Sequence, residues 1–247
     1  MASTTAFIGM EVRRTLGNGR YLLFTLGWPV MFYLLFTGIF AGSLGGVQYT
    51  QFLMVSMAAL GGLGAAFNAN ATRLAMERAG GWTRQLRVTP LSSGAYMAGK
   101  TAMAMLVVLP SLLVVGLAGA VVHHIALPAG EWLSLGLALW LGTLPFAFLG
   151  VLVGYLFDSQ SSQAGSMAVY LGLALLGGLW IPVQVMPKGL AAVAHWMPSY
   201  RYADMGWKLL AGKSPAPSDL LILAAYTLVF GLLAARSYRL DESREYA

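Results

Sequence analysis

The chain has 247 residues, of which 58% are hydrophobic and only 10% charged, and its mean hydropathy is +0.70. A soluble domain of this length cannot bury so much apolar surface, so the composition excludes a water-soluble protein and predicts one solvated by lipid. A formal charge of +6 and a pI near 9.7 would also suit a nucleic-acid-binding protein, but the basic residues form no stripe on a soluble element. No nucleic-acid partner is therefore expected. The chain has no cysteine, which excludes disulfides and thiolate chemistry.

Long runs without Asp, Glu, Lys or Arg predict the membrane spans, because roughly 20 residues cross a bilayer as a helix. The predicted spans are 21–41, 51–74, 97–122, 132–156, 164–181 and 220–235. The sixth has only 16 residues and is expected to begin earlier, near Pro217, with Ser218 as its cap. The expected fold class is therefore an all-α integral membrane protein with six transmembrane helices.

The basic residues predict the orientation of these spans. Eleven of the fifteen Lys and Arg residues lie before the first span, around the loop after the second, or after the sixth. Lys and Arg concentrate in cytoplasmic loops, so both termini are predicted to be cytoplasmic. The other four basic residues weaken this prediction without reversing it, because they fall on the predicted outer side. They are Lys188, Arg201, Lys208 and Lys213.

Two amphipathic segments lie outside the predicted spans. In residues 1–20, apolar residues alternate with Glu11, Arg13 and Arg14, which suits a helix on the membrane surface before the first span. Residues 183–216 contain two short aromatic-rich stretches, 188–197 and 200–210, separated by proline. They predict a pair of interfacial or re-entrant helices between spans five and six.

One stretch resembles a nucleotide-binding motif. Residues 94–101 read GAYMAGKT and match the phosphate-loop pattern G-x-x-x-x-G-K-[ST]. Such a loop follows a strand and opens a soluble helix, so that free backbone N–H groups hold phosphate. Here Pro90 precedes the motif, Thr101 opens an apolar run, and six spans leave no room for a soluble nucleotide-binding domain. The motif is therefore rejected, and Lys100 is interpreted as a cytoplasmic anchor of the third span.

Three stretches carry a resemblance to a known family. Residues 77–92 read ERAGGWTRQLRVTPLS, residues 177–187 read GGLWIPVQVMP and are followed by MPSY at 197–200, and EVRR stands at 11–14. Together they resemble the type-2 ABC transporter permeases, which are transmembrane subunits of daunorubicin-resistance-type drug exporters and of lipid exporters. The resemblance covers nearly the whole chain.

The resemblance implies one permease domain over residues 1–247, with an elbow helix at 1–20, a coupling loop at 75–95 and an extracellular re-entrant segment at 183–216. In the family, the loop after span two forms the coupling helix that docks into the ATPase. The corresponding residues here are Glu77, Arg78, Trp82, Arg84, Leu86 and Pro90. The chain departs from the family at Gly81 and Trp82, where a threonine and an aliphatic residue are more usual. An ordinary solvated basic loop is the alternative. In the re-entrant segment the matching residues are Pro187, Trp196, Pro198 and Tyr200.

The resemblance also implies a dimer whose second and fifth spans line the translocation path. The residues expected along it are Met54, Met57, Phe67, Asn68, Tyr170, Leu175, Leu176 and Trp180. For Asn68 an interhelical hydrogen bond is an equal alternative, and core packing or lipid contact competes for the others. An apolar path with soft Met side chains and few charges suits hydrophobic or amphiphilic cargo, either drug-like molecules or lipids.

The expected partners follow from the same resemblance. They are two copies of a separate ABC ATPase, a second permease copy or a homologous permease, membrane lipid and a hydrophobic small molecule. No catalytic, cofactor-binding or metal-binding residue is expected on this chain, because ATP and Mg²⁺ belong to the ATPase. The implied location is the plasma membrane of a prokaryote, and the implied role is multidrug export and antibiotic resistance. A gradient-driven secondary transporter and a non-transporting anchor of an ATPase stay open as alternatives.

Overall fold

The structure is a computed structural model and describes residues 9–11, 13–15, 17–39, 42–44, 47–83 and 93–244. Most of these residues are helical. The elements are α2 (Gly19–Ile39), β1 (Ser43–Leu44), β2 (Val47–Gln48), α3 (Tyr49–Asn68), α4 (Ala71–Ala79), α6 (Ser93–Val122), α7 (Ala129–Leu141), α8 (Leu144–Leu156), α9 (Ser162–Leu176), η1 (Val183–Val185), α10 (Lys188–Ala194), α11 (Pro198–Leu210) and α12 (Pro217–Arg244). Residues 9–11 and 13–15 are also helical. The small antiparallel hairpin of β1 and β2 interrupts an otherwise helical architecture.

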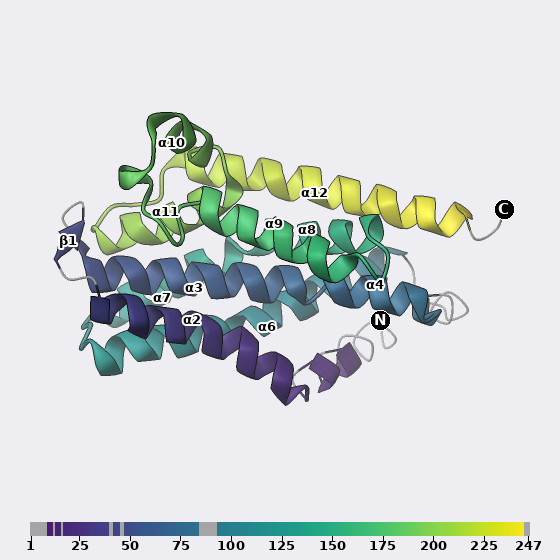
Figure 1. Cartoon of the computed structure of the whole chain (residues 1–247), viewed down its shortest axis with the longest axis horizontal. Coiled ribbons are helices and arrows are strands. Elements are labelled where there is room, and N and C mark those ends of the chain that lie inside the picture. Colours follow the sequence, from purple (N-terminus) through teal and green to yellow (C-terminus); the bar gives the residue numbers. More distant parts are fainter. Residues whose placement is uncertain are drawn as a thin grey trace.

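The long helices run side by side along one axis (Figure 1). Four helical stretches are long and apolar enough to cross a membrane: Tyr49–Ala79, Gly94–Val122, Ala129–Leu156 and Pro217–Asp241. Two shorter apolar helices, Leu23–Ile39 and Ser162–Leu176, occupy the places of the first and fifth predicted spans. The expectation of a helical membrane protein is confirmed. Six as the number of spans stays a prediction.

Helix α3 forms the core of the bundle. The most apolar stretch of Tyr49–Ala79 is 94% buried, against 17% for that of Pro217–Asp241. Glycine lets α8 approach α3 closely, since a Cβ on Gly150 would lie 2.3 Å from the carbonyl oxygen of Phe67. Such close contact of small residues is how helices pack in lipid, where no hydrophobic effect drives them together. Helix α3 is therefore enclosed by protein, and α12 turns most of its surface outward.

Two predicted spans are each built from two helices. The second consists of α3 and α4, and the fourth of α7 and α8. At the break in the fourth, a Cβ on Gly142 would come within 2.5 Å of the Tyr202 ring of α11, so glycine makes room for that ring. Pro145 then occupies the first turn of α8, where the missing N–H costs no helical hydrogen bond.

The end of the bundle opposite α4 carries the hairpin, α10 and α11 (Figure 1). The two short helices predicted between spans five and six are present as α10 and α11. Helix α12 begins at Pro217 as expected, but Ser218 is not its cap. Instead the carboxylate of Asp219 accepts the backbone N–H of Ala216 at 3.0 Å, as a residue in the third helical position does in a capping box.

Candidate functional site: a buried charge cluster beside the predicted coupling loop

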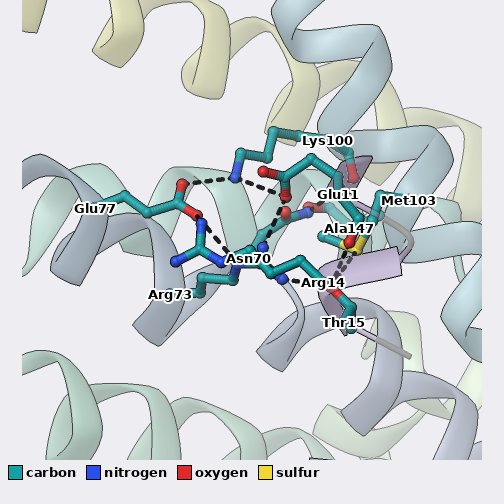
Figure 2. A network of polar contacts seen from close by, with 9 residues as sticks. All are labelled: Glu11, Arg14, Thr15, Asn70, Arg73, Glu77, Lys100, Met103 and Ala147. Carbon is teal, nitrogen blue, oxygen red and sulfur yellow. Dashed lines mark hydrogen bonds and ion pairs between the residues drawn. The ribbon is translucent and has the colours of Figure 1, made fainter. Parts of the chain in front are cut away.

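Side chains from three separate segments meet in a buried ionic cluster (Figure 2). Glu11 comes from the helical residues before α2, Arg73 and Glu77 from α4, and Lys100 from α6. The Lys100 Nζ atom lies 2.7 Å from Glu77 Oε2 and 3.3 Å from Glu11 Oε2. The Lys100 and Glu11 side chains are fully buried, and only 4% of the Glu77 side chain is exposed. Charges so far from water persist only when they are paired.

Arginines complete the cluster on its other side. Arg73 Nε lies 3.0 Å from Glu77 Oε1, one helical turn along α4, and its Nη2 lies 3.2 Å from Glu11 Oε2. Arg14 Nη1 lies 3.3 Å from Glu77 Oε1, and Arg73 Nη1 also donates to the Thr15 hydroxyl. Three cations thus surround two carboxylates, and both oxygens of Glu77 are paired.

An asparagine fixes the junction between α3 and α4. The buried Asn70 donates its Nδ2 to the carbonyl oxygens of Ala147 in α8, at 3.3 Å, and of Lys100 in α6, at 3.5 Å. These bonds connect the point where the second predicted span is interrupted to the main chains of α6 and α8. The junction is therefore held to two neighbouring helices, directly beside the ionic cluster.

Arg78 ties α4 to two further helices. Its Nε and Nη2 lie 3.1 and 2.5 Å from Asp241 Oδ1 in α12. Its Nη1 donates to the carbonyls of Gly154 and Tyr155, at 3.1 and 3.2 Å, near the end of α8. A cation at these carbonyls also interacts favourably with the negative end of the helix dipole.

These contacts place the predicted coupling residues that the structure describes. Glu77 points inward to the cluster, Arg78 is half-buried against α8 and α12, and Trp82 is half-buried in the turn of helix that follows α4. Three further predicted residues, Arg84, Leu86 and Pro90, lie outside the described residues. The large apolar side chain that α4 exposes is Met76, at 55%.

Two interpretations of residues 94–101 meet different outcomes. The rejection of the phosphate loop is confirmed, because these residues lie within α6 and their backbone belongs to a continuous helix. The interpretation of Lys100 as an anchor that reaches the membrane surface is wrong. Its ammonium group turns into the protein, because Glu11 and Glu77 are placed there to pair with it.

The residues predicted to line a path divide between the core and the surface of the single chain. Met54, Met57 and Phe67 are at most 1% exposed, whereas Leu175 is 42% exposed. Asn68, Leu176 and Trp180 are half-buried. Tyr170 of α9 packs on α3, because a Cβ on Gly64 would lie 3.1 Å from its ring and its hydroxyl lies 3.5 Å from the Leu60 carbonyl oxygen. Helices α3 and α9 are therefore neighbours, as the prediction requires.

A second ionic cluster lies at the opposite end of the bundle. Asp219, at the start of α12, is fully buried and accepts Arg201 Nη1 at 2.9 Å and Lys208 Nζ at 2.6 Å. Lys208 also pairs with Asp204 at 2.6 Å. This outer cluster joins α11 to α12. Two of the four basic residues that opposed the predicted orientation are thus neutralised by acidic neighbours.

The predicted re-entrant residues surround the short helices of that end. Pro187 is the residue before α10 and Pro198 is the first residue of α11, where each proline fits a helix start. Trp196 is 67% exposed and its carbonyl accepts the Tyr226 hydroxyl of α12 at 3.1 Å. Tyr200 is half-buried, and its ring meets the Trp207 ring edge-on with the centroids 5.9 Å apart.

The loop between α8 and α9 is capped by Asp158. Its Oδ1 accepts the Ser161 N–H at 2.7 Å, the Ser161 hydroxyl at 2.8 Å and the Gln160 N–H at 3.0 Å. These hydrogen bonds to Ser161 and Gln160 hold the pKa of Asp158 below its ordinary value, because they favour the charged carboxylate. The Asp158 carboxylate thus stabilises the turn from which α9 begins.

Sequence reasoning missed most of the first ionic cluster, which we call the inner cluster and which consists of Glu11, Arg14, Arg73, Glu77 and Lys100. Glu11 and Glu77 were assigned other roles, and Arg73, Lys100 and Asn70 were not joined to them. One signal was available: Arg73 and Glu77 stand four residues apart, directly after a charge-free run of 52 residues. Lone charges at the edge of such a run need partners in a membrane protein. The partner from α6 could not be identified without the tertiary structure.

Comparison with known proteins gives the family. Residues 40–236 match the sequence model of the ABC-2 family transporter protein. The chain is also 32% identical over 234 residues to a Bacillus subtilis (strain 168) protein named "Putative transport permease YvfS", and the match covers 94% of this chain and 96% of that protein. The chain therefore belongs to the ABC-2 family of transporter proteins, as a type-2 ABC permease and the transmembrane subunit of an ABC transporter.

Proposed function

We propose that this chain is the permease of an ATP-driven exporter that moves hydrophobic or amphiphilic molecules, drug-like compounds or lipids, out of the cytoplasm or the inner leaflet. ATP and Mg²⁺ would bind two copies of a separate ABC ATPase. The permease would pair with a second copy of itself or with a homologous permease. Multidrug export and antibiotic resistance are the physiological consequences that this activity would have.

The inner ionic cluster is the observation that carries the proposal. A partner that pushes on a short helix moves the spans only if that helix is joined to them. Glu77 and Arg73 join α4 to α6 and to the helical residues before α2, and Arg78 joins it to α8 and α12. The predicted coupling loop, 75–95, begins within α4, the helix that these contacts connect to its neighbours. That arrangement supports a role for α4 in passing ATPase movement to the spans.

The topology that we propose has six spans, an N-terminal elbow helix and both termini in the cytoplasm of a prokaryotic cell. The first described residues, α4 and the end of α12 lie at one end of the bundle (Figure 1). Among the described basic residues counted as cytoplasmic, Arg14, Arg73, Arg78 and Lys100 belong to that end, because they lie in α4 or contact it. Arg201 and Lys208 oppose this orientation less than their charge suggests, because Asp204 and Asp219 pair with them.

The cargo class rests on the helices that would face the path. Helices α3 and α9 are in contact, and their predicted path residues are apolar or aromatic apart from Asn68. Such a surface offers no fixed charge to an ion and few hydrogen-bond partners to a sugar. It suits molecules that partition into lipid.

The proposal is tested by isolating the chain from its native membrane in mild detergent. We expect a soluble subunit with nucleotide-binding motifs to co-purify, the complex to hydrolyse ATP, and inside-out vesicles to accumulate a hydrophobic fluorescent compound when ATP is supplied. Uptake driven by an ion gradient, with no ATPase in the preparation, would replace this function with secondary transport. An ATPase that co-purifies without any ATP-dependent uptake would indicate an anchor.

Two substitutions in α4 distinguish binding of the ATPase from transmission of ATPase movement to the spans. Met76→Asp changes an exposed side chain and should weaken ATPase binding without unfolding the permease. Glu77→Gln leaves the surface unchanged and removes a charge from the inner cluster. It should leave the ATPase bound but lower the ratio of cargo moved to ATP hydrolysed. A Glu77→Gln complex with unchanged coupling would remove the cluster from the mechanism.

A further inference from the structure

An apolar groove lies between α3, α6 and α7; it shares Met54 with the residues predicted along the path but is lined by no residue of α9. Its volume is about 550 Å³, which falls within the range of about 300–1,000 Å³ typical of small-molecule sites. Met54, Val55 and Ala58 of α3 form its floor. None of its lining residues is charged, and the walls are leucine, glycine, alanine and tryptophan.

The groove opens toward the surroundings of the bundle. On its rim, Leu113 and Leu117 of α6 are 63% and 61% exposed, and Leu133 of α7 is 64% exposed. Its floor is closed, since Met54, Val55 and Ala58 are at most 5% exposed. Both walls belong to helical stretches long and apolar enough to cross a membrane. The solvent at this groove is therefore the hydrocarbon of the bilayer.

The dimensions of the groove match one leaflet. Its lining residues on α6 run from Leu109 to Ala120, which is about 16 Å at a helical rise of about 1.5 Å per residue. Half of the hydrocarbon core of a bilayer is about 15 Å. The lining residues lie in the second half of α6 and in α7, on the side of the hairpin and α11 (Figure 1). The groove thus spans one leaflet, beside the end that carries the outer cluster.

Tryptophans stand at both ends of the groove. Trp132 lies near its outer end, where its ring is 3.4 Å from the Cβ position of Gly116. Trp140 lies at the inner end, and its Nε1 donates to the Met105 carbonyl at 2.8 Å. The indole N–H of Trp140 is thus satisfied by the protein. Only its apolar ring is offered to an occupant.

We propose that this groove is a binding site for one acyl chain of a membrane phospholipid. Water would find no hydrogen-bond partner there, and an empty groove would deprive its walls of dispersion contacts. A flexible hydrocarbon chain as long as one leaflet fills it without leaving a polar group unpaired. Since no charged residue lines the groove, it holds the chain and does not select the headgroup. The site does not depend on which cargo the transporter moves.

The experiment uses the full chain reconstituted in phosphatidylcholine vesicles that contain a small fraction of phosphatidylcholine with a diazirine in the middle of one acyl chain. After irradiation, labelled peptides are mapped. We expect label on α3 at Ala58 or Met54, the floor residues that keep some exposed surface and that bulk lipid can reach only through the groove, and an unchanged pattern in phosphatidylglycerol vesicles. No label on α3 would overturn the proposal, and labelling that requires one headgroup would overturn the claim that only the chain is held.

Gly136 provides a variant that fills the groove. It lines the groove, and a Cβ built on it meets no atom within 4 Å, so a larger side chain can extend into the open space. Gly136→Leu should abolish the label on α3 and leave the label on Leu228 and Leu232 of α12 unchanged. Gly130→Leu is the matched control, because Gly130 is in the same helix and equally unobstructed but does not line the groove.

Two outcomes would assign the groove to another occupant. Label on α3 that persists in Gly136→Leu would show that the chain reaches α3 elsewhere. Label that appears only when the protein is strongly diluted in the vesicles would show that a second copy covers the groove. Either result would overturn the proposal, and unchanged label on α12 shows that the variant is folded.

Discussion

The two ionic clusters at opposite ends of the bundle differ in what they join. The inner cluster brings together residues 89 positions apart in the sequence, Glu11 and Lys100. The pair that holds α4 to α6 is almost completely buried, with 0% of the Lys100 and 4% of the Glu77 side chain exposed, although Arg73 and Arg14 remain 19% and 54% exposed. The outer cluster joins α11 to α12 over 18 positions, from Arg201 to Asp219, and its cations keep 17% and 27% of their side chains exposed. The inner cluster connects elements that are far apart in the sequence, whereas the outer cluster connects two consecutive helices, α11 and α12.

This difference predicts different sensitivities. A buried ion pair adds little net stability relative to a well-packed apolar pair, but breaking it by removing one partner is costly. A partly exposed pair is compensated by water when it breaks. Substitutions should therefore cost more at the inner cluster, although both clusters contain similar contacts at similar distances.

Lys100→Met should have the largest effect. It leaves the carboxylates of Glu11 and Glu77 with only arginine partners in a site closed to water. The expected loss is about 3–5 kcal/mol of folding free energy. Thermal unfolding of the purified chain in detergent measures it. Lys213→Met, at an exposed position, is the control. Equal melting temperatures for the two variants would show that the inner cluster is not a structural joint.

Combining Lys100→Met with Glu77→Gln should recover part of that loss. The double variant removes a positive and a negative charge together, so only the Glu11 carboxylate is left facing the missing ammonium group. Contacting residues show coupling energies of about 0.5–3 kcal/mol in such cycles. The same unfolding measurement on both single variants and the double variant gives the coupling. Strictly additive losses would mean that the 2.7 Å contact between Lys100 and Glu77 carries no energy.

Asp219→Asn should have an intermediate effect. The amide keeps the shape of the side chain but loses the charge that faces Arg201 and Lys208, which remain partly solvated. Hydrogen bonds to charged groups contribute about 1.5–3 kcal/mol each, and Lys208 retains its contact with Asp204. Hydrogen exchange should increase in α11 and the first turn of α12 and stay unchanged in α4. Increased exchange in α4 would mean that the two ends are not independent.

Arg78→Lys should have the smallest effect. Lysine keeps the positive charge beside Asp241 but cannot contact that carboxylate and the carbonyls of Gly154 and Tyr155 together. Because a quarter of the Arg78 side chain is exposed, we expect a loss of about 1 kcal/mol or less. The loss should shrink further in high salt, where exposed pairs are screened. A loss of folding free energy as large as that of Lys100→Met would show that Arg78 contributes as much to stability as the inner cluster does.

The sequence by itself determined the class of the protein and most of its helices. Charge-free runs require a lipid environment whatever their partners, so the predicted spans overlap α2, α6, α9 and α12. The bounds of α2 and α6 agree to within four residues, whereas α9 ends five residues earlier and α12 nine residues later than predicted. Proline at the starts of α11 and α12 acts locally, through its fixed backbone angle and missing N–H, and such boundaries are readable from the chain. The loop motifs were sufficient to indicate the family.

Only the tertiary structure decided how the interrupted spans break and which charges meet. The break at Gly142 depends on the ring of Tyr202, sixty residues away, and the role of Asn70 depends on carbonyls supplied by α6 and α8. Lys100 has the same sequence context whether it turns out to the membrane surface or in to Glu11 and Glu77. The direction of its side chain follows from the positions of those carboxylates. The orientation of a buried charged side chain depends on its partners in space and not on its neighbours in the sequence.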